Sequence, residues 1–175
     1  MQLEELFGYK NVLMKKLLTS ETIVRLLNDD IKMEDAKQLA YDQVYPTEYI
    51  PETLHDGDTF IMFDVDILSS PTPTKTFLTP TLYIWVIAHR SRLKLPEGGV
   101  RTDAICSEIS KLINGSTEFG LGELNLTSVK RFAPATDYGG KVMTFVTRDF
   151  NRLHDPKKFI PKNRVSNWTN PDGNN

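Results

Sequence analysis

The clearest pattern in the chain is a two-residue alternation of apolar and polar side chains over residues 59–68, TFIMFDVDIL. One face of this segment carries Ile61, Phe63, Val65 and Ile67, and the other carries Met62, Asp64 and Asp66. Successive side chains of a strand point to opposite faces of its sheet. The pattern therefore predicts a half-buried strand that presents two carboxylates on one side.

A second strand is expected over residues 75–90, with a possible kink at Pro80, after the proline-rich turn SSPTPT at 69–74. Both of its faces are apolar. Leu82, Ile84, Val86 and Ala88 alternate with Tyr83, Trp85, Ile87 and His89. A strand that is apolar on both sides is typical of the centre of a sheet. We expect it to be covered on both sides or to lie at a subunit contact.

The apolar period then changes to that of a helix over residues 101–114, for which Thr102 is the candidate N-cap. Its core face is formed by Ile105, Ile109, Leu112 and Ile113. Asn114-Gly115 is a good helix end. Strands are expected over 122–132 and 141–150, separated by a turn at 137–140.

The first 41 residues predict helices over 2–17, 21–28 and 33–41. Pro46 and Pro51 exclude a long helix or a central strand over 42–58, although the aromatic residues there indicate a loop that packs down. The expected fold is α+β: N-terminal helices, then a strand-strand-helix-strand-strand antiparallel sheet with the helix packed on one face. The helical segment 1–41 and the core 42–150 would form one domain, with an extended C-terminal arm at 151–175.

That arm differs in composition from the rest of the chain. It is rich in proline and asparagine and has too few large apolar residues to fold alone. Its spaced anchors favour ordering against a neighbour, although a disordered tail stays open as the alternative. We therefore expect a subunit or partner interface formed by Tyr83, Trp85, Ile87, Phe159, Ile160, Arg164 and Trp168.

Charge is distributed unevenly along the chain, although the net charge is only −2. Residues 1–58 have a balance of −6, residues 59–150 of +1 and residues 151–175 of +3. Copies with an acidic head and a basic tail could dock head to tail, although imbalances of this size also arise by chance. The early acidic residues argue against a signal peptide, and no apolar run is long enough to predict a membrane span.

Candidate chemistry is sparse. Asp64 and Asp66 point the same way on a strand and could bind Mg²⁺ for nuclease chemistry. That chemistry needs further ligands and usually a lysine, and none stands out, so the polar face of an amphipathic strand is the favoured explanation. His55, His89 and His154 are scattered, and the single cysteine, Cys106, follows Ile105 on an amphipathic helix, which indicates a small core or boundary residue. Gly120-Leu121-Gly122 precedes a strand, which favours a turn over a phosphate cradle. We expect no catalytic residues, no metal and no cofactor.

Three segments together resemble proteins of the neck of tailed bacteriophages. They are QVYPTEYIPET, then LYIWVIAHRSRL…GGVRTDAICSEISKLING, then FGLGELNLTSVKRFAP…YGGKVMTFVTRDFNR. The resemblance covers residues 42–152 and is greatest to the tail terminator (tail-to-head joining) family. The shared pattern includes a helix that opens with Arg-x-Asp, here Arg101 and Asp103.

This resemblance implies an assembly protein without catalysis, located in the neck of a virion and made in the host cytoplasm. Tail terminators form a ring, commonly hexameric, that caps the tail tube and joins it to the head-side connector. The implied partners are other copies of the chain, the tail tube protein and the connector or stopper, while DNA passes through the lumen without sequence-specific binding. A head-side stopper or adaptor, or a tail-completion protein, is the alternative within the same neck.

Overall fold

The computed structural model describes residues 3–48, 58–69 and 77–150. The expected arm at 151–175, the proline-rich turn and much of the loop at 42–58 lie outside the described residues. The helices are α1 (Leu3–Thr19), α2 (Glu21–Leu27) and α3 (Arg101–Ile113), with 3₁₀ helices η1 (Met33–Leu39) and η2 (Arg90–Arg92). The strands are β1 (Val44–Tyr45), β2 (Thr59–Ser69), β3 (Phe77–His89), β4 (Asn125–Phe132), β5 (Tyr138–Val146) and β6 (Asp149–Phe150).

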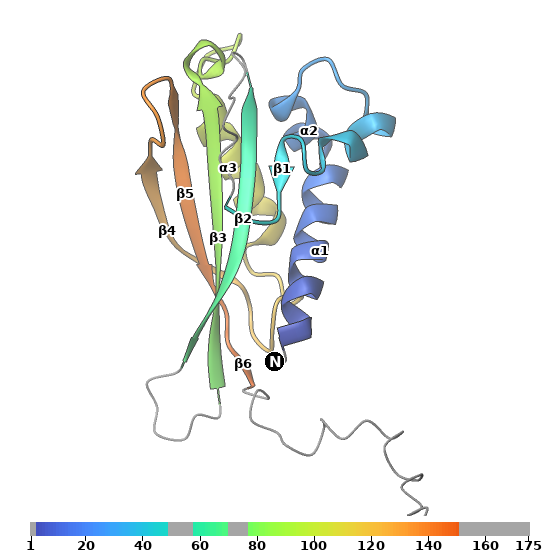
Figure 1. Cartoon of the computed structure of the whole chain (residues 1–175), viewed down its shortest axis with the longest axis vertical. Helices are drawn as coiled ribbons and strands as arrows, with labels where there is room; N and C mark the ends of the chain where they lie inside the picture. Colours follow the sequence, from blue (N-terminus) through green and yellow to red (C-terminus); the bar gives the residue numbers. More distant parts are fainter. Residues whose placement is uncertain (1–2, 49–57, 70–76, 151–175) are drawn as a thin grey trace, which may run out of the picture.

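The described strands form one sheet in the order β1-β2-β3-β5-β4, with β6 paired to the beginning of β3 (Figure 1). The long β2–β3 hairpin pairs Thr59 with Ala88 at one end and Ser69 with Leu78 at the other. All neighbouring pairs are antiparallel except β1 with β2, so the sheet is mixed. This confirms the expected α+β class and the strand-strand-helix-strand-strand order, and it places β3 at the centre.

The main core lies between one face of this sheet and a layer of helices. In Figure 1, α3 lies behind β2 and β3, and α1 lies beside β2. Its fully buried side chains include Leu13 and Leu17 of α1, Phe63 of β2, Ile109 of α3 and Phe145 of β5. The apolar stripe predicted for α3 is confirmed, since Ile105, Ile109 and Ile113 are buried and Leu112 packs at the margin.

Local signals explain several element ends. Ser20 caps α2, because its Oγ accepts a hydrogen bond from the amide of Ile23 at 3.5 Å. Asn114 and Gly115 end α3 as predicted, with Gly115 at a φ of +80° that suits glycine. The third helix is a 3₁₀ helix that ends at Leu39, because its C-cap Ala40 is extended with a ψ of 126°. Tyr41 then adopts a left-handed φ of 61°.

Two predictions about the second half of the chain were wrong. Thr102 does not cap α3: Val100 is the N-cap, without a side-chain hydrogen bond, and Thr102 is buried in the first turn. Residues 138–140 do not form a turn but begin β5, which ends at Val146 and is followed by the separate β6. Gly140 serves close strand packing, because a Cβ there would lie 1.9 Å from the carbonyl oxygen of Val86.

The third predicted strand was also too long at its beginning. β4 begins at Asn125 and not at residue 122. The preceding residues are bound to the end of α3 instead, because the amide of Gly115 donates to the carbonyl of Leu124 and the amide of Leu124 donates to that of Ser116. Backbone groups that are satisfied by a helix end are not available to a neighbouring strand.

Candidate functional site

The sheet face opposite the helices is the first candidate surface, and we call it the outer face. Along β3 it presents Tyr83 and Trp85, whose rings stack with centroids 5.9 Å apart and an interplanar angle of 27°. Both side chains are half-buried. In the register of the sheet, Tyr83 lies between Asp64 and Thr144, and Trp85 lies between Met62 and Val142. The expected apolar character of both sides of β3 is therefore present.

A small second core supports this outer face. Phe60, Met62, Ile87 and Tyr138 are buried together, and the partly buried Trp85 packs against them. All members of this cluster come from strands, in contrast to the helix-lined main core. Of the three β3 residues predicted for an interface, Ile87 is fully buried and belongs to this second core. The other two, Tyr83 and Trp85, are partly exposed.

The two carboxylates of β2 have different surroundings. Asp64 forms an ion pair with Lys10 of α1 at 2.7 Å, and its Oδ1 accepts a hydrogen bond from the amide of Val65. Asp66 is exposed. The neighbouring strand β3 sets Tyr83 opposite Asp64 and Thr81 opposite Asp66. Among the described residues, no group of three or more His, Cys, Asp or Glu side chains could hold a metal ion.

The two other candidate side chains that the structure describes, His89 and Cys106, pack against neighbouring residues of the fold. Nδ1 of His89 lies 2.8 Å from Oγ of Ser91, and its ring meets the edge of Tyr138. Cys106 is buried in α3, as expected for a small core residue, and burial raises the pKa of its thiol to about 12. His55 and His154 lie outside the described residues, as do the arm anchors Phe159, Ile160, Arg164 and Trp168.

The opening residues of α3 join the helical segment to the sheet domain. Arg101 is almost fully buried, and its guanidinium contacts both carboxylate oxygens of Asp29 at 3.2 Å. It also donates to the carbonyls of Leu26 at 2.8 Å and Arg92 at 2.9 Å. Asp103 forms an ion pair with Lys141 of β5 at 3.2 Å. Both polar residues of the Arg-x-Asp opening therefore hold neighbouring elements in place.

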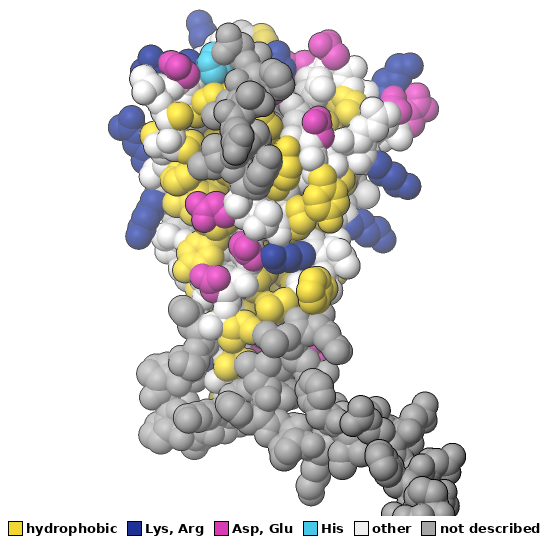
Figure 2. Space-filling model, viewed as in Figure 1, with side chains coloured by type: hydrophobic (Ala, Val, Ile, Leu, Met, Phe, Trp, Pro, Cys, Tyr) yellow, Lys and Arg dark blue, Asp and Glu magenta, His cyan; other side chains and the backbone are white. Residues whose placement is uncertain are grey.

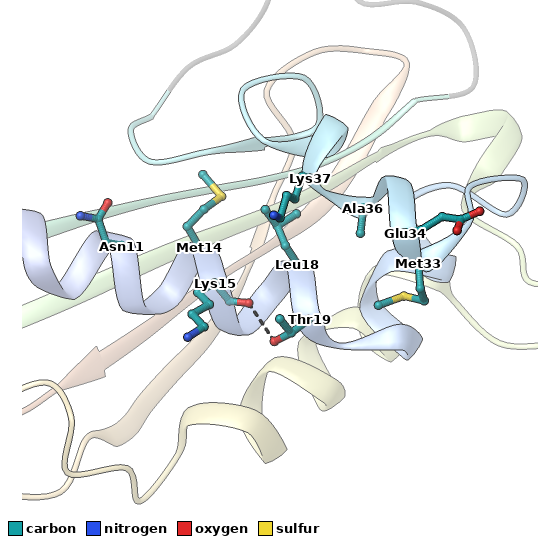
Figure 3. A pocket seen from close by; sticks show the side chains of 9 residues that line it. All are labelled: Asn11, Met14, Lys15, Leu18, Thr19, Met33, Glu34, Ala36 and Lys37. Atoms are coloured by element: carbon teal, nitrogen blue, oxygen red, sulfur yellow. Dashed lines mark hydrogen bonds between the residues drawn. The ribbon is translucent and has the colours of Figure 1, made fainter.

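A groove between α1 and η1 is the second candidate surface, and the sequence reasoning missed it. It encloses about 530 Å³. Met14 and Leu18 project from α1 toward η1, which contributes Met33 and Ala36 (Figure 3). The polar lining residues are Asn11, Lys15, Thr19, Glu34 and Lys37.

Two exposed apolar residues mark the same side of the molecule. Phe7, one turn before Asn11 on α1, is 72% exposed, and Met33 is 39% exposed. Phe7 lies outside the buried stripe of α1, to which Leu13 and Leu17 belong. Only the packing of the helix against β2 distinguishes the two faces of such a segment. Among the described residues, no helix is long and apolar enough to cross a membrane.

Comparison with solved structures finds the same fold in a chain of the virion of a native gene transfer agent particle. The two chains share 16% sequence identity and superpose with a TM-score of 0.51. The match covers 83% of this chain and 97% of that one. At this identity the likeness establishes the fold alone.

Comparison with curated proteins gave no match. The family model of the YomW family matches residues 16–147, which run from the last turn of α1 to the end of β5. The match thus includes the sheet, α3, η1 and most of the groove between α1 and η1. This chain belongs to the YomW family.

Proposed function

We propose that this chain is a structural protein of a tailed-phage virion, and specifically the tail terminator. In this role it forms a ring that caps the tail tube, ends its polymerisation and joins it to the head-side connector. The observation that carries the proposal is the fold that it shares with nearly the whole length of a gene transfer agent virion chain. The neck-protein resemblance of residues 42–152 supports the same role.

The geometry of the sheet suits a closed ring. Each copy in a ring uses two different faces, one toward each neighbour. The sheet order places β1 and β2, flanked by α1, at one side and β4 at the other. The β4 side carries Lys130 and Arg131, both exposed, and the β2 side carries Asp66. Unlike sides of this kind favour head-to-tail contacts, and we propose six copies.

The proposed partners follow from this arrangement. The ring contacts itself, the tail tube protein on one side and the connector or stopper protein on the other. DNA crosses the lumen without sequence-specific binding, so we expect the lumen to be neutral or acidic. A channel lined with lysine would neutralise phosphates and retain the genome. A lysine-lined lumen in the assembled ring would contradict this part of the proposal.

A head-side stopper or adaptor, or a tail-completion protein, is the second candidate, because a shared virion fold leaves the particular ring open. Removal of the gene from a phage that encodes this chain separates the roles by electron microscopy. Loss of a terminator should give tubes that grow beyond normal length, beside unjoined heads. Tails of normal length beside heads that have lost their DNA would support the stopper and contradict the terminator. The wild-type gene supplied in trans is the control.

A further inference from the structure

The outer face has an apolar stripe that no described helix covers. In the described residues, α1, α2 and α3 all contribute to the main core, whereas the cluster beneath the outer face consists of strand residues only. The stripe follows β3 through the stacked Tyr83–Trp85 pair. At the beginning of β3, Phe77 stacks on Phe150 with centroids 5.3 Å apart, and Phe150 is 41% exposed. In Figure 2, hydrophobic and acidic side chains intermingle over the middle of the view.

The last described residue, Phe150, lies at the Phe77 end of this stripe, and the direction of β6 leads away from Tyr83 and Trp85. β6 continues the direction of β5 along β3, and its last residue, Phe150, pairs with Phe77, the first residue of β3. Tyr83 lies six residues further along β3, roughly 20 Å at the rise of a strand. A return to Tyr83 of the same copy would therefore require the chain to reverse direction after Phe150, which favours the stripe of another copy as the docking surface.

The sequence after Phe150 suits such a stripe. Residues 151–175 contain two acids and five bases, with Phe159, Ile160 and Trp168 as spaced apolar anchors. Fully extended, 25 residues span at most about 80–90 Å, enough to cross a neighbouring subunit. Aromatic side chains pack favourably on other aromatic rings, either offset-stacked or edge to face, and the Tyr83–Trp85 pair provides two such rings.

Electrostatics contribute less to this contact than apolar packing does. The outer face offers the exposed Asp66 to a basic segment, but Asp64 is already paired with Lys10. Two further bases lie on the same sheet: Lys130 on β4 and Arg148, whose guanidinium sits 5.6 Å from the ring centroid of Phe77. The groove between α1 and η1 has a similar balance, with Lys15, Lys37 and Glu34 in its lining, so charge does not separate the two surfaces.

We propose that residues 151–175 of one copy dock on the outer face of the next copy, with their aromatic anchors against Tyr83 and Trp85. This inference rests on the proposed ring and names the contact that closes it. Each copy supplies an arm to one neighbour and an outer face to the other, as a head-to-tail ring requires.

Cysteine cross-linking tests the proposal directly, because the native Cys106 is buried and does not interfere. Two differently tagged chains are co-expressed, one with Ser166→Cys beside Trp168 and one with Thr144→Cys, which is paired with Tyr83. On oxidation we expect a disulfide that joins the two tags. The matched control replaces Thr144→Cys by Asn11→Cys in the groove, and its yield should be at least five-fold lower. Thermal unfolding verifies that each variant is folded.

Three results would overturn the proposal. The first is the absence of a disulfide with the Thr144→Cys chain, and the second is an equal or higher yield with the Asn11→Cys chain. The third comes from a further variant, a single chain that carries both Ser166→Cys and Thr144→Cys: a disulfide that forms only within such chains, and never between two of them, would place the arm on its own copy. The native mass of the same preparations distinguishes the arm from the proposed function. Rings that cap tail tubes but give no disulfide would refute the arm contact alone, whereas a monomeric chain would refute both.

Discussion

At the scale of single residues, two adjacent glycines show why the beginning of β5 could not be located from the sequence. Gly139 and Gly140 suggested a turn, since glycine is frequent there. In the fold, Gly140 belongs to β5 and pairs with Ile87 of β3. The backbone of β3 lies so close to it that a side chain larger than a hydrogen atom does not fit. Local sequence carries no information about a strand that is 50 residues away, so this use of glycine was not predictable.

Replacement of Gly140 by alanine should therefore destabilise the protein. The added Cβ would lie 1.9 Å from the carbonyl oxygen of Val86 and 2.9 Å from Cα of Ile87, both of which are backbone atoms. Overpacking of this kind typically costs about 1–3 kcal/mol. Gly139→Ala is the control, because its nearest neighbour would be Leu93 Cδ1 at an ordinary 3.6 Å. Urea unfolding of both variants measures the difference, and equal stabilities would contradict the described register.

Cys106 provides a second test at the same scale. Burial raises the pKa of its thiol to about 12, so the folded state disfavours the thiolate. The folded protein should thus resist alkylation by iodoacetamide at pH 9, and the unfolded chain should react readily. Because the folded pKa is raised, the contribution of this thiol to stability is fully present below the ordinary cysteine pKa and declines as pH rises toward 12. Equal alkylation rates with and without denaturant would show that Cys106 is accessible.

At the scale of elements, alternation and helical periodicity predicted the order of the strands and the helix between them. Tyr83 and Trp85 were correctly placed on the opposite side of β3 from Val86, because side-chain direction follows from strand period alone. The groove between α1 and η1 was not predicted, since it depends on how two helices pack. The bidentate contact of Arg101 with Asp29 joins residues 72 positions apart, and no local pattern signals it.

Loss of this contact should loosen the attachment of the N-terminal helices. Arg101→Ala removes one of two arginine partners of Asp29, which also forms an ion pair with Arg92 at 3.1 Å. It also takes the side-chain donor away from the carbonyls of Leu26 and Arg92. An acceptor that is left unsatisfied in the interior costs about 1–3 kcal/mol. We therefore expect the free energy of unfolding to fall by at least about 2 kcal/mol, the typical cost of one such acceptor. The control is Arg25→Ala, which breaks the exposed pair with Glu21 and should cost less than about 0.5 kcal/mol. Similar melting temperatures for the two variants would contradict this role of Arg101.

At the scale of the whole molecule, the fold class followed from the sequence, and family membership followed from comparison. The ring did not follow from either, because a heterologous interface is formed by surfaces that the single chain leaves open. Among the residues that the structure describes, the outer face, the groove and the two sides of the sheet are such surfaces. In the proposed ring, each subunit has its own main core, and its exposed apolar groups lie at the contacts with neighbouring copies.

The native mass of the purified chain, alone and mixed with the tail tube protein from the same phage, tests the central claim most directly. The account predicts a closed ring of six copies, either alone or on contact with tube ends. It also predicts that addition of the chain stops tube growth at a stoichiometry of one ring per end. A chain that stays monomeric at micromolar concentration, and leaves both the mass and the growth of the tube unchanged, would contradict it.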